Sequence, residues 1–254
     1  MGRIIAVANQ KGGVGKTTTA INLAACLAEK GKKVLAVDMD PQGNLASGLG
    51  VDKDSVEKSI YELIIGEIVI KEVINKEVLE NLDIIPTSID LSAAEIELIG
   101  VDDKEYILRN AIDQVKDQYD FVIIDCPPSL SMLTINAMTT ADSVIVPIQC
   151  EYYALEGLSQ LIHTVELVKD RLNSKLEIEG VVFTMYDART NLSLQVVENV
   201  KDNLQQNIYK TIIPRNIRLA EAPSYGLPIN KYDPKSTGAE SYMRLADEVI
   251  EREE

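Results

Sequence analysis

The sequence predicts an α/β fold in which a mostly parallel, twisted sheet carries helices on both faces. Short apolar, β-branched runs alternate with amphipathic stretches along the whole chain, which is typical of a parallel sheet covered by helices. Several runs, including FVIID and SVIVP, are apolar without alternation, as expected for strands buried on both faces. No repeat or Pro/Gly/Ser-rich linker divides the 254 residues, so we expect a single domain over residues 1–254.

The apolar runs predict seven strands in chain order. They cover Arg3–Ala8, Lys33–Asp38, Leu82–Ile85, Phe121–Asp125, Ser143–Pro147, Ile178–Thr184 and Thr211–Ile213. An amphipathic helix is expected over Thr17–Lys30, because Gly31 stands where a glycine commonly ends a helix. Residues Lys53–Glu80 predict short helices on one edge of the sheet, with their charges on a solvated face.

Charge is unevenly distributed along the chain. The formal net charge is −15, which by itself argues against a nucleic-acid-binding protein. Residues 180–235 nevertheless contain seven basic and five acidic side chains, so this segment has a net charge of +2 and the remainder −17. A local basic surface is therefore compatible with an acidic protein.

Cysteine usage and hydropathy indicate a cytoplasmic protein. Cys26, Cys126 and Cys150 form no Cys-x-x-Cys pair, which favours a reducing compartment. The start, MGRIIAVANQ, enters an apolar run directly and does not resemble a signal peptide. No apolar run is long enough for a membrane-spanning helix, which needs about 18 residues.

A glycine-rich segment between the first strand and the first helix predicts a phosphate-binding loop. The segment KGGVGKTT runs from Lys11 to Thr18, but Gln10 stands where the usual pattern has its first glycine, and Lys11 follows it. Glycines let backbone N–H groups turn toward an anion at the positive end of a helix. The expected ligands are ATP and Mg²⁺, held by Gly12, Gly13, Val14, Gly15, Lys16 for the β- and γ-phosphates, Thr17 for Mg²⁺ and Thr18 for the α-phosphate.

Carboxylates follow two of the predicted strands. Asp38 and Asp40 end the second strand, and Asp125 closes FVIID. Ligands of parallel sheets bind at the carboxyl ends of the strands, so we expect Asp125 to hold Mg²⁺ through water, as a Walker B aspartate does. The prolines of CPPS after Asp125 predict a stiff turn, which suits a switch that senses the γ-phosphate.

These motifs together resemble a known family. KGGVGKTT, VDMDPQGN, FVIIDCPPSL, EYYALEGLSQL and IPRNIRLAEAPSYGLPI resemble the ParA/MinD class of deviant Walker A ATPases, and most of all the chromosome-partitioning ParA proteins called Soj. The resemblance implies a P-loop NTPase-type fold and an ATP-dependent homodimer that binds DNA nonspecifically. It also implies release after hydrolysis stimulated by a ParB-like protein, and a cytoplasmic, nucleoid-associated location.

The resemblance also implies roles for individual residues. Lys11 would cross the interface of a nucleotide-sandwich dimer and reach the phosphates of the partner subunit, which gives the second lysine of the loop a purpose. Asp40 would position the attacking water, and Asp38 would be an outer contact of the Mg²⁺ site. Further roles are adenine contacts for Pro214 and Asn216, and DNA phosphate contacts for Arg189 and Arg218.

Three alternatives remain at this point. An orphan ParA relative that positions another cargo would share every feature above. A MinD-like membrane ATPase would need a basic amphipathic C-terminal helix, whereas the stripe of Tyr242, Leu245, Ala246, Val249 and Ile250 has a mostly acidic polar face and is better explained by packing on the sheet. A reductase-like relative would need two cysteines for an iron–sulfur cluster, for which Cys126 and Cys150 are the candidates.

Overall fold

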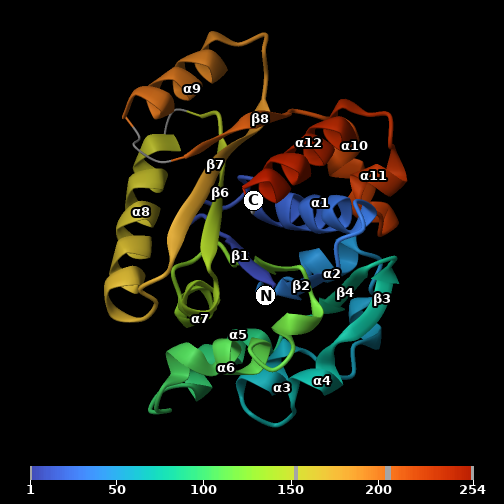
Figure 1. The fold of residues 1–254 in the computed structure, drawn as a ribbon, viewed down its shortest axis with the longest axis vertical. Helices are drawn as coiled ribbons and strands as arrows, with labels where there is room; N and C mark the ends of the chain where they lie inside the picture. Colours follow the sequence, from blue (N-terminus) through green and yellow to red (C-terminus); the bar gives the residue numbers. More distant parts are fainter. Residues whose placement is uncertain (1, 152–153, 204–206, 253–254) are drawn as a thin grey trace.

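One twisted sheet of eight strands forms the centre of the computed structural model, which describes residues 2–151, 154–203 and 207–252 (Figure 1). The strands are β1 (Arg3–Val7), β2 (Val34–Asp38), β3 (Asn75–Leu79), β4 (Leu82–Ile85), β5 (Phe121–Asp125), β6 (Ser143–Gln149), β7 (Glu177–Tyr186) and β8 (Ile208–Pro214). Their order across the sheet is β3-β4-β2-β5-β1-β6-β7-β8. Every neighbouring pair is parallel except β3 and β4.

Helices cover both faces of the sheet, as the sequence predicts. They are α1 (Lys16–Glu29), α2 (Asn44–Gly48), α3 (Ile60–Ile64), α4 (Ile70–Val73), α5 (Leu91–Glu97), α6 (Ile107–Ile112), α7 (Met132–Thr140), α8 (Ala154–Arg171), α9 (Asn191–Asn203), α10 (Ile217–Glu221), α11 (Ile229–Tyr232) and α12 (Thr237–Glu251). In Figure 1, α1 and α10 to α12 lie to one side of the central strands, and α5 to α8 lie to the other. The α/β prediction is confirmed.

Two apolar clusters, one on each face, hold these layers together. Successive residues of a strand alternate between them: Phe121 and Ile123 join the cluster under α1 and α12, whereas Val122 and Ile124 join the one under α5 to α8. All four are completely buried. Burial of both strand faces explains why FVIID is apolar without alternation.

The prediction for Lys53–Glu80 was wrong in one part. Short helices α3 and α4 are present, but the end of the segment forms β3, an antiparallel edge strand. Its first three residues are exposed, so no apolar pattern marks it as a strand. Asp83 of β4 fixes the hairpin, because its carboxylate accepts hydrogen bonds from Lys76 Nζ at 2.7 Å and from the Glu77 amide at 2.8 Å.

Strand register gathers the predicted site at one edge of the sheet. Val7 at the end of β1 is paired with Asp125 at the end of β5, and Asp125 is paired in turn with Asp38 at the end of β2. The glycine-rich loop follows β1 directly. Because these strands are parallel and adjacent, the loop and both carboxylates lie in the crevice where ligands bind in such folds.

The C-terminal helix is folded onto the body of the protein. The apolar stripe of α12 is buried at Tyr242, Leu245, Ala246 and Val249, in the same apolar cluster as α1. The stripe is therefore used for packing, as expected from its acidic polar face. Among the described residues, no helix combines the length and the apolar composition needed to cross a membrane.

Candidate functional site

The glycine-rich loop forms an open cradle at the start of α1. Gly13 and Gly15 have φ of 75° and 88°, left-handed conformations that glycine adopts without steric cost. A Cβ added at Gly12 or Gly13 would meet no atom within 4 Å. Thr184 of β7 fixes the loop from outside, since its hydroxyl donates to the Val14 carbonyl at 2.7 Å. The geometry suits an anion held by backbone N–H groups at a helix N-terminus.

The two lysines of the loop point to different places. Lys16 is buried, and its Nζ donates to the Lys11 carbonyl at 3.2 Å. Burial lowers the pKa of the Lys16 ammonium, although Asp125, Cys126 and Asp40 act in the opposite direction. Lys11 instead extends outward, and its Nζ lies 2.6 Å from Glu151 Oε2 in a half-exposed ion pair. The Lys16 ammonium therefore lies inside the cradle, whereas the Lys11 ammonium is held at its edge by Glu151.

Asp125 is a buried carboxylate that lacks hydrogen-bond partners. Its side chain is fully buried, and neither Oδ1 nor Oδ2 has a partner among the described residues. Burial raises the pKa of Asp125 well above its usual range, and the nearby Asp38 raises it further. The Thr17 hydroxyl lies near this carboxylate and lowers its pKa, although the two groups do not form a hydrogen bond of standard geometry. A buried carboxylate without partners fits a cation site, because a cation would compensate its charge.

Asp38 and Asp40 shape the loop that follows β2. Both oxygens of Asp38 accept backbone N–H groups, from Asp40 at 3.2 Å and from Ala46 at 3.0 Å. Burial raises the pKa of Asp38 to about 7, although these N–H groups lower it. Asp40 Oδ1 accepts from the Gln42 amide at 3.0 Å, which closes a tight turn ending at Gly43. Asp38 thus supports the loop on which Asp40 is carried.

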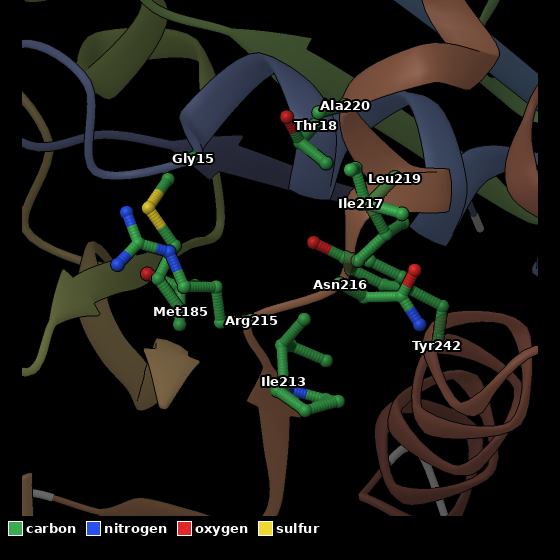
Figure 2. Close-up of a pocket in the computed structure, with 12 residues that line it drawn as sticks. Gly15, Thr18, Met185, Ile213, Arg215, Asn216, Ile217, Leu219, Ala220 and Tyr242 are labelled. Carbon is green, nitrogen blue, oxygen red and sulfur yellow. The ribbon is translucent and has the colours of Figure 1, made fainter. Parts of the chain in front are cut away.

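An apolar pocket of about 510 Å³ adjoins the cradle. Figure 2 shows Gly15 and Thr18 of the loop and α1 on one side of it, with Asn216, Ile217 and Tyr242 opposite. Both predicted adenine contacts line this pocket, Pro214 and Asn216. Its volume and apolar walls suit a purine base attached to phosphates in the cradle.

Both the oxygen and the nitrogen of the Asn216 side-chain amide form hydrogen bonds within the protein. Its Oδ1 accepts the Arg218 amide at 2.8 Å, which caps α10, and its Nδ2 donates to Thr237 Oγ1 at 2.8 Å. The amide is thereby oriented rigidly at the pocket wall. A base would meet a polar group that is already held in position.

Several residues of this site escape sequence reasoning. The pocket also contains Met185, Arg215, Ile217 and Tyr242, which come from β7, α12 and the segment around α10. Met185 carries a backbone signal, a φ of 51°, which is uncommon for a residue other than glycine. Arg215 and Ile217 lie in the segment IPRNIRLAEAPSYGLPI, but no motif joins Met185 or Tyr242 to it, and the fold alone brings them together.

Both predicted DNA contacts are exposed and already paired with acids. The Arg189 side chain is 87% exposed and forms two bonds to Asp187, at 2.8 and 2.7 Å. Arg218 Nη1 lies 2.9 Å from Glu221, and its Nε lies 3.5 Å from Asp233. The Arg189 bonds hold the pKa of Asp187 below its usual range. Exposed ion pairs are weak, so both guanidinium groups remain available to a phosphate.

The cysteines are buried structural residues in this fold. Cys126 and Cys150 are 0% and 6% exposed, and both are free thiols. Burial raises the pKa of the Cys150 thiol to about 11 and that of Cys126 further. A raised pKa disfavours the thiolate, which is the form that ligates metals.

These features define a P-loop nucleotide-binding site. They are an anion cradle at a helix N-terminus, a buried lysine in that cradle, a buried aspartate without a hydrogen-bond partner among the described residues at the end of the neighbouring strand, and an apolar pocket beside them. The sequence of this loop, with Gln10 in place of the first glycine and a second lysine at position 11, matches the deviant Walker A pattern within this class.

Comparisons with known proteins agree with this class. A family model described as AAA domain matches residues 2–178. The chain is 58% identical to the sporulation initiation inhibitor protein Soj of Bacillus subtilis (strain 168), with 98% of both chains covered. It is 52% identical to the chromosome partitioning protein ParA of Myxococcus xanthus (strain DK1622), with 100% of this chain and 89% of that protein covered.

A solved structure provides an independent comparison. The cobyrinic acid a,c-diamide synthase from Mycobacterium smegmatis, with a bound ATP analog and magnesium, superposes with a TM-score of 0.87 at 38% identity. The match covers 98% of this chain and 95% of that one. The chain belongs to the ParA/Soj family of deviant Walker A ATPases within this AAA-domain group. The resemblance inferred from the motifs is confirmed.

Proposed function

We propose that this protein is an ATP-dependent partitioning ATPase of chromosomes or plasmids. Two copies close around two Mg²⁺-bound ATP molecules, the dimer binds DNA nonspecifically on the nucleoid, and a ParB-like protein stimulates hydrolysis and release. One observation carries the proposal: Lys16 fills the phosphate cradle of its own subunit, while Lys11 is directed outward to Glu151. An ammonium group in that position is available to a nucleotide bound by a second copy.

The residues at the strand ends fit Mg²⁺ and ATP. Neither oxygen of Asp125 has a partner among residues 2–151, 154–203 and 207–252, and its position beside Thr17 supplies the acid and hydroxyl that hold magnesium in P-loop sites. No group of three or more acidic, His or Cys side chains could hold a metal alone in the described residues. Magnesium prefers such incomplete sites, where phosphates and waters supply the other ligands, and it would neutralise the β- and γ-phosphate oxygens.

Hydrolysis then depends on two groups of this chain. Asp40 is placed on the tight turn after β2, where its second carboxylate oxygen can orient water in line with the γ-phosphorus. Attack by that water would break the bond to the β-phosphate oxygen and leave ADP and phosphate. Lys11 of the second subunit would stabilise the charge on the γ-phosphate oxygens, as an arginine finger does.

Nonspecific DNA binding is supported by Arg189 and Arg218. Each subunit offers these two exposed guanidinium groups, so a dimer offers about four phosphate contacts. Four contacts predict a slope of roughly −3 to −4 for log K against log salt. DNA binding by the dimer should therefore be much stronger than by the monomer, which makes it dependent on ATP.

Mixed dimers test the trans role of Lys11 directly. Lys11→Ala retains Asp40 but lacks the transferred amine, and Asp40→Ala retains Lys11 but cannot orient water. Each variant alone should be inactive. An equimolar mixture should recover about one quarter of the wild-type rate, since half of the dimers are mixed and each has one complete site. A mixture as inactive as its components would place Lys11 in cis and overturn the proposal.

A further inference from the structure

The outer side of α5 carries large aliphatic side chains that the fold does not bury. Ile89, Ile96 and Ile99 are 65%, 71% and 75% exposed. The opposite side of the same helix, formed by Leu91, Ala94 and Leu98, is buried in the core. Helix α5 is therefore apolar on two sides, and only one of them contributes to folding.

The three isoleucines form one continuous row. The backbone stays close to helical beyond both ends of α5, because Ser92 N donates to Ile89 O and Ile99 N donates to Ile96 O, both at 3.1 Å. Separations of seven and three residues place side chains on the same side of a helix. We name Ile89, Ile96 and Ile99 the α5 stripe. Spacings of three and seven residues also occur along the line of contact between two packed helices.

A cavity lies beside the end of α5, between it and the residues of α3 and α6. It has a volume of about 380 Å³, and its walls include Ile64, Ile65, Leu98, Val101 and Ile107. Val101 follows Ile99 by two residues, lines this cavity and is itself 43% exposed, so the cavity opens close to the end of the stripe. A partner lying along the stripe could place a large apolar side chain in this cavity, as interface anchors do.

Acidic side chains surround this apolar surface. Residues 86–106 contain six acids, Asp90, Glu95, Glu97, Asp102, Asp103 and Glu105, against the single base Lys104. A second copy of the chain would bring like charges together, and DNA or an anionic membrane would be repelled. Charge complementarity favours a basic partner.

The stripe is linked to the turn that carries Asp40. Thr87, two residues before Ile89, packs on that turn so closely that a Cβ added at Gly43 would lie 3.3 Å from Thr87 Cγ2. In Figure 1, α5 lies at the opposite end of the molecule from α9, next to which Arg189 is placed. A partner on the stripe would reach the Asp40 turn without covering that DNA contact.

We propose that the α5 stripe and its adjoining cavity bind a basic amphipathic helix, and that this helix is supplied by the ParB-like protein. The inference rests on the proposed function for the identity of the partner. The helix would place aliphatic side chains on Ile96 and Ile99, with lysines and arginines on the surrounding acids. Docking would then act on the Asp40 turn through Thr87 and accelerate hydrolysis.

The test uses Ile96→Asp and Ile99→Asp in the full chain, with Leu167→Asp as the matched control. Leu167 is 40% exposed but belongs to α8. The probe is a fluorescent peptide of the lysine- and arginine-rich N-terminal segment of the ParB-like protein from the same genome. We expect each stripe variant to weaken peptide binding by at least about tenfold and to lose stimulated ATPase activity. Leu167→Asp should behave as wild type.

Basal ATPase activity and DNA binding should be unchanged in the stripe variants. Exchange of Asp90 and Asp102 for lysine should weaken the peptide and flatten its salt dependence. Stripe variants that are stimulated like wild type would overturn the inference and leave the proposed function intact. A change in ATP-dependent dimerisation without a change in peptide binding would assign the stripe to a second copy instead. Wild type that neither binds nor responds to the peptide would overturn the partner step of both proposals.

Discussion

Replacing Asp125 by Asn should stabilise the free protein and abolish its response to magnesium. Both carboxylate oxygens are buried and have no hydrogen-bond partner in the part of the chain that the structure describes, and burial raises the pKa of the group well above its usual range. A buried unsatisfied polar group costs about 1–3 kcal/mol, and more when it is charged. A neutral amide of the same size removes the charged part of that cost, so we expect a gain of about 1–2 kcal/mol.

The gain can be read as a shift in melting temperature. For a domain of this size, 1 kcal/mol corresponds to about 2–4 °C, so Asp125→Asn should melt roughly 2–8 °C above wild type without ligand. Wild type should gain further stability from ATP only when magnesium is present, because binding to the native state raises stability. The variant should lose most of this magnesium-dependent increment, since a neutral amide is a poor ligand for a hard cation.

Differential scanning fluorimetry with ATP in magnesium or in EDTA measures both effects. Asp170→Asn provides the control, since Asp170 lies exposed on α8 far along the chain from the site. A free Asp125→Asn protein that melts below wild type would refute the argument from unsatisfied burial. An unchanged increment from magnesium would remove Asp125 from the metal site.

Three further predictions address hydrolysis, DNA binding and folding. Asp40→Ala should bind ATP and sediment as a dimer on DNA, with hydrolysis reduced by about 10²-fold or more; a monomer in sedimentation velocity would contradict the role of Asp40. Arg189→Glu should dimerise with ATP but lose DNA in fluorescence anisotropy, and wild-type binding that does not vary with salt would dismiss the phosphate contacts. Asp83→Asn should destabilise the β3–β4 hairpin by about 1–3 kcal/mol at neutral pH. Although burial raises the pKa of Asp83, bonds from Lys76, the Glu77 amide and Tyr119 lower it below its usual value. This stability is therefore present above the unfolded pKa and is lost as pH falls through the lowered folded pKa, so urea unfolding should show wild type and variant converging in acid. A difference that persists in acid would argue against the carboxylate.

The central strands could be predicted from the sequence because their burial is visible in composition. β1, β2 and β5 are apolar on both faces, and such short continuous runs are typical of parallel strands covered by helices on both sides. β3 could not be predicted. It is an edge strand whose first three residues are exposed, and it is held by hydrogen bonds to the Asp83 carboxylate. Such bonds leave no periodic pattern of apolar residues in β3 or β4.

In the site too, some residues could be predicted from the sequence and others could not. The cradle is local in sequence, so Gly12 to Thr18 could be recognised from residue type and spacing alone. The pocket wall is not local: Tyr242 of α12 and Thr18 of α1 line the same pocket only after folding. The partner of Lys11 is likewise hidden, because Glu151 is 140 positions away.

The outward direction of Lys11 has a kinetic consequence. If each active centre needs an amine from another molecule, solitary copies bind ATP but keep it. Turnover per molecule should then rise with protein concentration and level off once pairing is complete, rather than stay constant as in a self-sufficient enzyme. Where copies are dilute, ATP is conserved, and where they accumulate, consumption begins. An amine supplied by a second copy would in this way make the enzyme a sensor of its own local density.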